Sequence, residues 1–263
     1  MIGLVIVSLF FFLALIGPSI APYSPDTINL NHEYILANAN HLLGTTDNGV
    51  DILSVLLHGA RLAAVVSLCV VFLSTFIGGI LGMVAAYFGK TVDQIVSGFA
   101  DMVQAFPSIL LNIGIVALVA HAGLSHLIFA LVATGWVLYA RIARAETLSI
   151  KERDYISSAK ALGYNTPRTL LRHILPNIAA PMLIQASTGM GSAIVAESTL
   201  SFLGLGPGTT SSWGTLLDQG SAVLLRFPHV ALYAGSTIAI TVLGFNLFGD
   251  WLRDRLDPTR QHS

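Results

Sequence analysis

Six long runs of apolar residues divide this chain, and each is long enough to cross a membrane as a helix. A hydrocarbon core of about 30 Å requires about 20 apolar residues in a helix. The runs occupy residues 2–21, 62–88, 95–120, 124–140, 178–200 and 230–248. The pattern predicts an all-α, polytopic membrane protein with six transmembrane helices.

Positive charge is distributed unevenly between the connecting segments. Of the 13 lysines and arginines, eleven fall in the segment 141–177, in the tail or in the short loop after the second run, and two, Arg61 and Arg226, fall on the opposite side. Cytoplasmic loops carry the excess of Lys and Arg. We therefore expect the loop 141–177 and both termini to be cytoplasmic.

The polar segments on the other side differ in character. The first, between runs one and two, is rich in Pro and Asn, and a short helix capped by Asn48 or Asp51 is expected at residues 51–58. The second, 202–227, is rich in Gly and can re-enter the membrane if it lines a cavity. We divide the chain into a first helix with its outer segment (1–61), a membrane core (62–249) and a cytoplasmic tail (250–263).

Composition supports the membrane assignment. Hydrophobic residues make up 54% of the chain and charged residues 10%, against about 25% charged in an ordinary soluble domain. A lone cysteine, Cys69, excludes a disulfide framework and a Cys-rich metal site. The first run begins without a preceding basic residue, so we favour a retained helix over a cleaved signal peptide, although Ser19-Ile20-Ala21 is a possible cleavage site.

Few polar side chains fall inside the runs, and these are the candidate path-lining or paired residues. They are Asp101, Gln104, Asn112 and Glu197. Intramembrane acids are costly and are hypotheses for function. Each acid stands alone in its run, which favours structural pairing over a proton relay. Pro107 predicts a kink in the third run.

The sequence contains no recognisable nucleotide-binding, hydrolase or metal-binding motif. Gly89-Lys90-Thr91 resembles the end of a phosphate-binding loop, but Val84 stands where that loop needs its first Gly. The eight histidines are scattered, and no hydrolase or metalloprotease motif occurs, so no catalytic or metal site is predicted. Gly78 and Gly82 form a G-x-x-x-G pair that lets two helix backbones approach closely.

The cytoplasmic loop 141–177 is the strongest functional signal. Tyr155, Ala159 and Leu162 recur at i, i+4 and i+7, which predicts a short helix with one apolar face. Gly163 suits the left-handed cap that ends such a helix. A small residue such as Ala159 on an exposed short helix between two spans suits insertion of that helix into a groove of a partner protein.

A second short helix is expected to follow. Thr166 is the predicted N-cap, with Pro167 at the first helical position, and the helix runs through Leu175. Pro176 marks the entry to the fifth span.

This loop resembles the coupling loop of membrane subunits of binding-protein-dependent ABC importers, which reads Glu-Ala-Ala, three residues, Gly, then Ile-x-Leu-Pro. The matching residues are Ser157-Ser158-Ala159, Gly163 and Ile174-Leu175-Pro176-Asn177, with Ser in place of the leading Glu and first Ala. The nearest subgroup is the C-type permeases of dipeptide, oligopeptide and nickel systems. Three further stretches carry that resemblance: Leu43–Asp51, Leu200–Gly214 and Phe245–Pro258. The subgroup usually has Arg where this chain has Val50 and Val55.

The resemblance implies a type I ABC importer permease in a bacterial inner membrane. Its partners would be a B-type permease, two cytoplasmic ATPase subunits, an extracytoplasmic binding protein and lipid, with no nucleic acid. ATP and Mg would be bound by the ATPases, with no cofactor or enzymatic activity in this chain. The resemblance assigns ATPase coupling to Tyr155, Ser157, Ser158, Ala159, Leu162, Gly163, Ile174, Leu175 and Pro176.

Alternatives remain at this stage. Peptides are the first choice of substrate, and nickel or a metal chelate is the second. A secondary transporter would need spans paired by internal symmetry, and no such pairing is visible. A membrane-embedded enzyme would need convergent polar residues inside the spans, and few are present.

Overall fold

The computed structural model describes residues 1–119, 123–208 and 211–256, and of Lys160 only the backbone. The end of the third predicted run, residue 120, and the tail from 257 onward lie outside these ranges. The described residues form helices joined by loops, without a β-strand. The helices are α1 (Ile2–Ile20), α2 (Ile52–Phe88), α3 (Lys90–Gln104), α4 (Ser108–Ala117), α5 (Leu124–Lys151), α6 (Asp154–Ala161), α7 (Thr166–Thr169), α8 (Leu175–Phe202), α9 (Trp213–Ala222) and α10 (Pro228–Leu256), with a 3-10 turn at Leu30–His32 and a π-helical stretch at Leu170–Ile174.

Five described helices are long and apolar enough to cross a membrane, and the pair α3 and α4 brings the number to six if it counts as one broken span. The two halves of that pair meet at 84°. Pro107 lies at the break with an extended ψ of 124°, and the residue before a proline is disfavoured in helical conformation. The six-span expectation therefore holds, with the predicted kink in the third run widened into a sharp bend.

Several helices are longer than the apolar runs that predicted them. α2 has 37 residues, which corresponds to about 55 Å, because the short helix expected after residue 51 continues without a break into the second span. Asp51 caps it by accepting the backbone N–H of Ser54 at 2.9 Å. α5 likewise continues to Lys151, beyond the predicted end at 140. A hydropathy run marks the apolar part of a helix and not its hydrogen-bonded ends.

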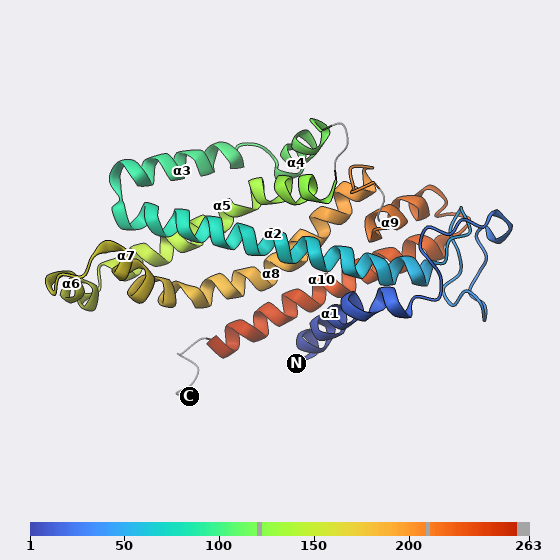
Figure 1. Ribbon diagram of the computed structural model, residues 1–263, viewed down its shortest axis with the longest axis horizontal. Helices are drawn as coiled ribbons and strands as arrows, with labels where there is room; N and C mark the ends of the chain where they lie inside the picture. The colour runs from blue at the N-terminus through green and yellow to red at the C-terminus, as the bar shows by residue number, and fades with distance from the viewer. Residues whose placement is uncertain (120–122, 209–210, 257–263) are drawn as a thin grey trace.

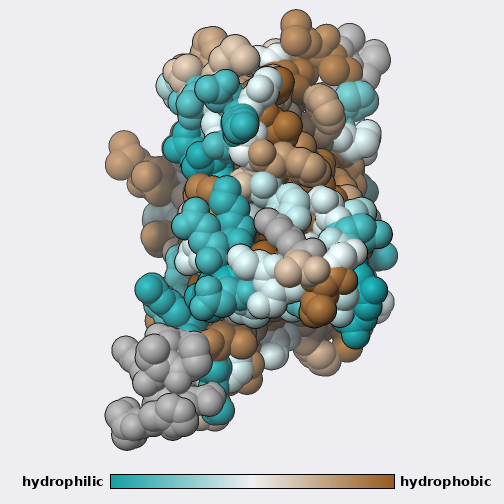
Figure 2. All heavy atoms as spheres, turned by 90° about the vertical axis from the view of Figure 1, so that its left-hand side faces the viewer, coloured by the Kyte–Doolittle hydropathy of each residue, from teal (hydrophilic) through white to brown (hydrophobic). Residues whose placement is uncertain are grey.

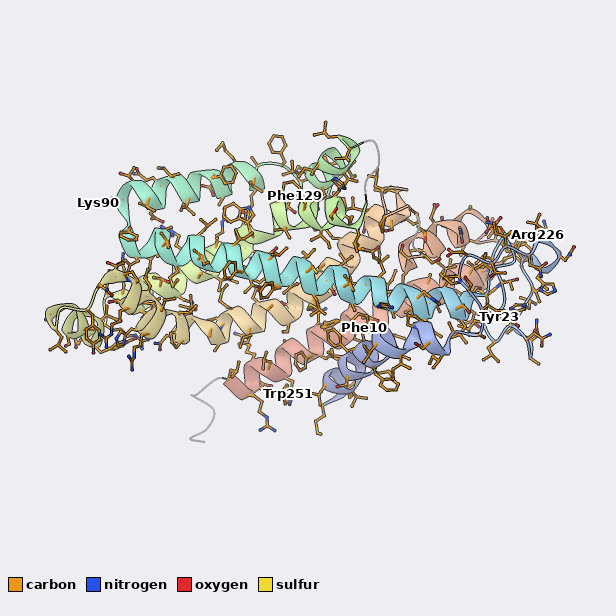
Figure 3. The ribbon with its side chains drawn as sticks, in the orientation of Figure 1. Phe10, Tyr23, Lys90, Phe129, Arg226 and Trp251 are labelled. Atoms are coloured by element: carbon orange, nitrogen blue, oxygen red, sulfur yellow. The ribbon has the colours of Figure 1, made fainter. Side chains whose placement is uncertain are left out.

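The long helices lie roughly along one axis of the molecule (Figure 1). α6 and α7 lie at one end, here called the hairpin end, and α9 with the segment 21–51 lies at the other, here called the loop end. Lys90 lies toward the hairpin end, whereas Tyr23 and Arg226 lie at the loop end (Figure 3). The predicted separation of the polar hairpin from the loops is therefore present in the fold. Viewed onto the hairpin end, much of the surface is hydrophilic (Figure 2).

α2 and α5 form the closest helix pair. A Cβ atom on Gly78 would lie 2.8 Å from the backbone nitrogen of Ala140, and one on Gly82 would lie 2.9 Å from the Ala140 Cα. Only residues without a side chain fit at such positions. The G-x-x-x-G pair thus allows the close backbone approach expected from the sequence, and its partner is α5 of the same chain.

The loop end is tied to the membrane helices by α9. Trp213 is buried, and its indole Nε1 donates a hydrogen bond to the Leu56 carbonyl oxygen of α2 at 2.9 Å. The ring of Tyr34 stacks on Phe227 with 4.2 Å between centroids. The segment 202–227 is therefore partly helical, and in this chain it packs against α2, α8 and α10.

Candidate functional site

α6 is the predicted helix of the coupling loop, but its buried face differs from the predicted one. Ile156 is fully buried in the main core and Ala159 is 5% exposed, whereas Tyr155 and Leu162 are 40% and 76% exposed. The prediction that Tyr155, Ala159 and Leu162 share one face is wrong for Ala159, which is buried together with Ile156. The periodicity identified apolar positions correctly but could not show that Ile156, which is adjacent to Tyr155, is the residue that anchors the helix.

The end of α6 agrees with the predicted glycine cap. Gly163 has a φ of +83°, in the left-handed region. The N–H of Tyr164 donates to the Ala159 carbonyl at 3.1 Å, and that of Leu162 to the Ser158 carbonyl at 3.0 Å. The 6→1 bond from Tyr164 is the hydrogen bond of a Schellman motif. This cap turns the chain sharply toward α7.

α7 begins one residue earlier than predicted. Asn165, and not Thr166, is the N-cap, because its side-chain oxygen accepts the backbone N–H of Arg168 at 3.1 Å. The helical path then continues through the π-helical stretch into α8, so that residues 166–202 form one continuous helical element. Pro176 lies in the first turn of α8, just after the π-helical stretch.

Aromatic contacts hold the hairpin together. The Tyr164 ring lies under the Arg168 guanidinium at 4.2 Å and stacks on His173 at 5.7 Å. The residues predicted for ATPase coupling divide by exposure. Exposed are Tyr155, Ser157, Ser158, Leu162, Gly163, Leu175 and Pro176; buried are Ala159 and Ile174. Ile174 belongs to the main hydrophobic core, and Ala159 is also buried.

The two intramembrane acids lie in different environments. Asp101 pairs with Arg141 of α5 at 2.7 Å between Oδ1 and Nη2. Glu197 is buried, and its carboxylate oxygens accept the hydroxyls of Ser201 at 2.7 Å and Ser198 at 3.2 Å. Both acids are thus paired or hydrogen-bonded, as the sequence analysis favoured, although the cation beside Asp101 could not be identified from the sequence.

The two intramembrane amides do not join these acids in one site. Asn112 is buried in α4, and its side-chain oxygen accepts the Thr134 hydroxyl at 3.0 Å. Gln104 is exposed at the end of α3. The four predicted polar residues therefore occupy separate places and do not converge.

A second ion pair between α3 and α5 was missed by the sequence analysis. Arg144 binds Asp93 through both Nε and Nη2, at 2.5 and 2.6 Å. Nearby, the Lys151 ammonium donates to the Ala86 carbonyl at 2.8 Å. Arg144 had been placed in a loop because hydropathy ended the fourth span at 140. The signal that could have located it is the helical spacing of Arg141 and Arg144.

Histidines gather at the loop end more closely than the sequence suggested. The His41 ring is buried, with Nδ1 3.0 Å from Asp51 Oδ1 and Nε2 3.4 Å from His32 Nδ1. These side chains border a cavity of about 190 Å³. Among the residues that the structure describes, no three His, Cys, Asp or Glu side chains are arranged to hold a metal ion.

The fold and the hairpin define a helical, membrane-embedded transport subunit, and comparison with known families agrees. The profile described as binding-protein-dependent transport system inner membrane component matches residues 78–262, and the N-terminal TM domain of oligopeptide transport permease C matches residues 1–39. The chain belongs to the family of binding-protein-dependent transport system inner membrane components. The predicted resemblance to membrane subunits of binding-protein-dependent ABC importers is therefore confirmed.

Relatives are similar over almost the whole chain. The dipeptide transport system permease protein DppC of Alkalihalophilus pseudofirmus is 36% identical over 98% of this chain and 84% of its own length. The oligopeptide transport system permease protein OppC of Bacillus subtilis is 36% identical over 98% and 85%. The di/tripeptide transport system permease protein DppC of Pseudomonas aeruginosa is 36% identical over 97% and 86%.

Solved structures share the fold at low identity. An inward-facing MetNI methionine ABC transporter superposes with a TM-score of 0.64 and 16% identity, covering 76% of this chain and 95% of that chain. An amino acid ABC transporter crystallised with histidines gives 0.54 and 17%, covering 79% and 99%. The predicted all-α fold of an ABC importer permease is confirmed.

Proposed function

We propose that this chain is one of two membrane subunits of an ATP-driven importer for short peptides, with a B-type permease forming the other half of the path. The observation that carries the proposal is 36% identity over at least 97% of the chain to permeases named for dipeptide, di/tripeptide and oligopeptide transport. An extracytoplasmic binding protein would deliver the peptide to the loop end.

Energy would come from two ATPase subunits, which bind ATP and Mg and dock at the hairpin end. The exposed side chains of Tyr155, Ser158 and Leu162 would fill the ATPase groove, while Ile156 and Ala159 anchor α6 from behind. Because residues 166–202 are one helical element, a displacement of the hairpin would rotate α8 and open or close the path, as in a rigid-body switch.

The same proposal sets the orientation in a bacterial inner membrane. The hairpin end would face the cytoplasm together with both termini. The support is the excess of Lys and Arg on that side, eleven of 13, and the placement of α6 and α7 opposite the loops (Figure 1).

Uptake by whole cells tests the substrate. A strain lacking this chain should fail to accumulate a radiolabelled dipeptide, and expression of the chain should restore uptake; a strain carrying a Walker-motif mutation in the partner ATPase is the control for ATP dependence. Labelled nickel should enter equally with and without the chain. Loss of nickel uptake with normal dipeptide uptake would replace the peptide assignment with the nickel alternative.

A further inference from the structure

α3 has two faces of opposite character. Its outer face carries an apolar stripe at spacings of three, four and three, each member between 37% and 66% exposed: Val92, Ile95, Phe99 and Met102. The Phe99 ring also stacks on Trp136 of α5, with 5.8 Å between centroids. Its inner face carries Asp93, Ser97 and Asp101, and both acids are bound to arginines of α5. A helix in lipid turns its charged side toward protein or a water-filled cavity. α3 therefore separates a charged interior surface from an apolar exterior.

The two ion pairs between α3 and α5 are built differently. Arg144 holds Asp93 with two short hydrogen bonds, and the side chains are 37% and 21% exposed. Arg141 holds Asp101 with one bond, and the side chains are 52% and 68% exposed. A two-bond fork fixes a helix in place. The single-bond pair leaves donors on Arg141 and an oxygen on Asp101 without a side-chain partner among the described residues.

The pair formed by Asp101 and Arg141 borders a cavity of about 400 Å³ between α2, α3 and α5. Gly82 and Ala140 form part of its wall, where the backbones of α2 and α5 meet. Its size falls within the range of about 300–1,000 Å³ that is usual for small-molecule sites. Arg144 also lines the cavity but is held by Asp93. The more exposed pair, Arg141 and Asp101, therefore offers a cationic and an anionic group side by side to a molecule that carries both charges.

We propose that Asp101 and Arg141 form a station on the translocation path that binds the charged ends of the transported peptide, a step that rests on the peptide importer function proposed above. Arg141 would bind the terminal carboxylate and Asp101 the terminal ammonium. The two ends of a dipeptide are at most about 7 Å apart, so one molecule can reach both groups. When no peptide is present, the two side chains pair with each other.

Transport by the complete importer in proteoliposomes, with labelled dialanine as the probe, tests this. The double variant Asp101→Asn with Arg141→Gln removes both charges without leaving one unpaired, and Ile95→Leu on the outer stripe, where the side chain is 66% exposed, is the control. We expect uptake to fall about tenfold or more in the double variant and to stay normal in the control. The melting temperature of the complex should not change, because an exposed ion pair contributes little stability.

The outcomes separate the two proposals. Normal dialanine uptake by the double variant overturns the station and leaves the importer function intact. Absence of dialanine uptake by the wild-type importer overturns the peptide function, and the station with it. A fall in uptake that accompanies a matching fall in melting temperature also counts against the station, because it indicates a structural role.

Cysteine labelling gives a second test that keeps both charges. In a Cys69→Ser background, Ser97→Cys places a thiol in the cavity wall and Ile95→Cys places one on the apolar stripe. During ATP-driven turnover, a charged thiol reagent should modify position 97 and not position 95, and saturating dialanine should slow the modification at position 97. Modification at position 97 that dialanine does not slow contradicts the station.

Discussion

Substitution of single glycines in α2 tests how tightly this helix packs on α5. Gly82 lies against the backbone of Ala140, so that a Cβ there would come within 2.8 Å of its carbonyl carbon. Gly79, three residues earlier, lies on another side of the helix, where a Cβ would meet only the terminal methyl of Met182 at 3.2 Å. Gly82→Ala and Gly79→Ala are therefore chemically identical changes with opposite packing consequences.

The magnitudes follow from those contacts. Backbone atoms cannot rotate away, so Gly82→Ala forces the two helices apart, and such overpacking costs about 1–3 kcal/mol. A methionine methyl moves easily, and alanine is favoured over glycine in a helix by about 1 kcal/mol. Because the helix-propensity gain is the same at both positions, it cancels in the comparison. We expect the purified complex with Gly82→Ala to melt about 2–12 °C below the one with Gly79→Ala, using about 2–4 °C per kcal/mol.

Thermal denaturation of the detergent-purified complex is the assay, with peptide uptake measured in parallel. Ala140→Gly should not rescue Gly82→Ala, because the obstructing atoms belong to the main chain. Equal melting temperatures for the two glycine variants would refute the packing argument, and so would rescue by Ala140→Gly.

Three further changes have defined outcomes. Gly163→Val forces a β-branched residue into a left-handed conformation, at a cost of about 1–2 kcal/mol. Peptide uptake should be lost while membrane insertion stays intact, whereas Gly163→Asn should keep most uptake. Normal uptake by the valine variant would contradict the role of Gly163 as a cap. Asp93→Asn removes one partner of the Arg144 fork and should lower the yield of folded complex, corresponding to about 1–3 kcal/mol; an unchanged yield contradicts a structural role. Trp213→Phe loses the hydrogen bond to Leu56 and should destabilise the complex by about 1 kcal/mol, which a small downward shift in melting temperature would detect.

Local chemistry made much of the hairpin predictable. Gly163 needs no knowledge of the rest of the chain to favour a left-handed cap, and its φ of +83° agrees. The burial of Ala159 was not predictable in the same way, because it depends on Ile156 meeting a core built by distant segments. A glycine cap is a property of three or four residues, whereas a buried face is a property of the whole fold.

The intramembrane polar residues show the same difference between what local sequence predicts and what depends on the whole fold. Asp101 was identified as an acid in need of a partner, since an isolated charge in an apolar run is costly. Its partner Arg141 lies 40 residues away and had been assigned to a loop, because hydropathy falls where α5 continues. The pair between Asp93 and Arg144 was missed for the same reason. Contacts between helices need a helix register that apolar runs do not supply.

The central claim is that a separate ATPase subunit binds the hairpin. Crosslinking in the assembled importer tests this claim most directly. In a Cys69→Ser background, Leu162→Cys presents an exposed thiol on α6, and a thiol-to-amine crosslinker of short span is applied with ATP absent and then present. The account predicts an adduct with the ATPase subunit from position 162, with a yield that changes when ATP binds. An accessible thiol at this position that never captures the ATPase in either state would contradict the account.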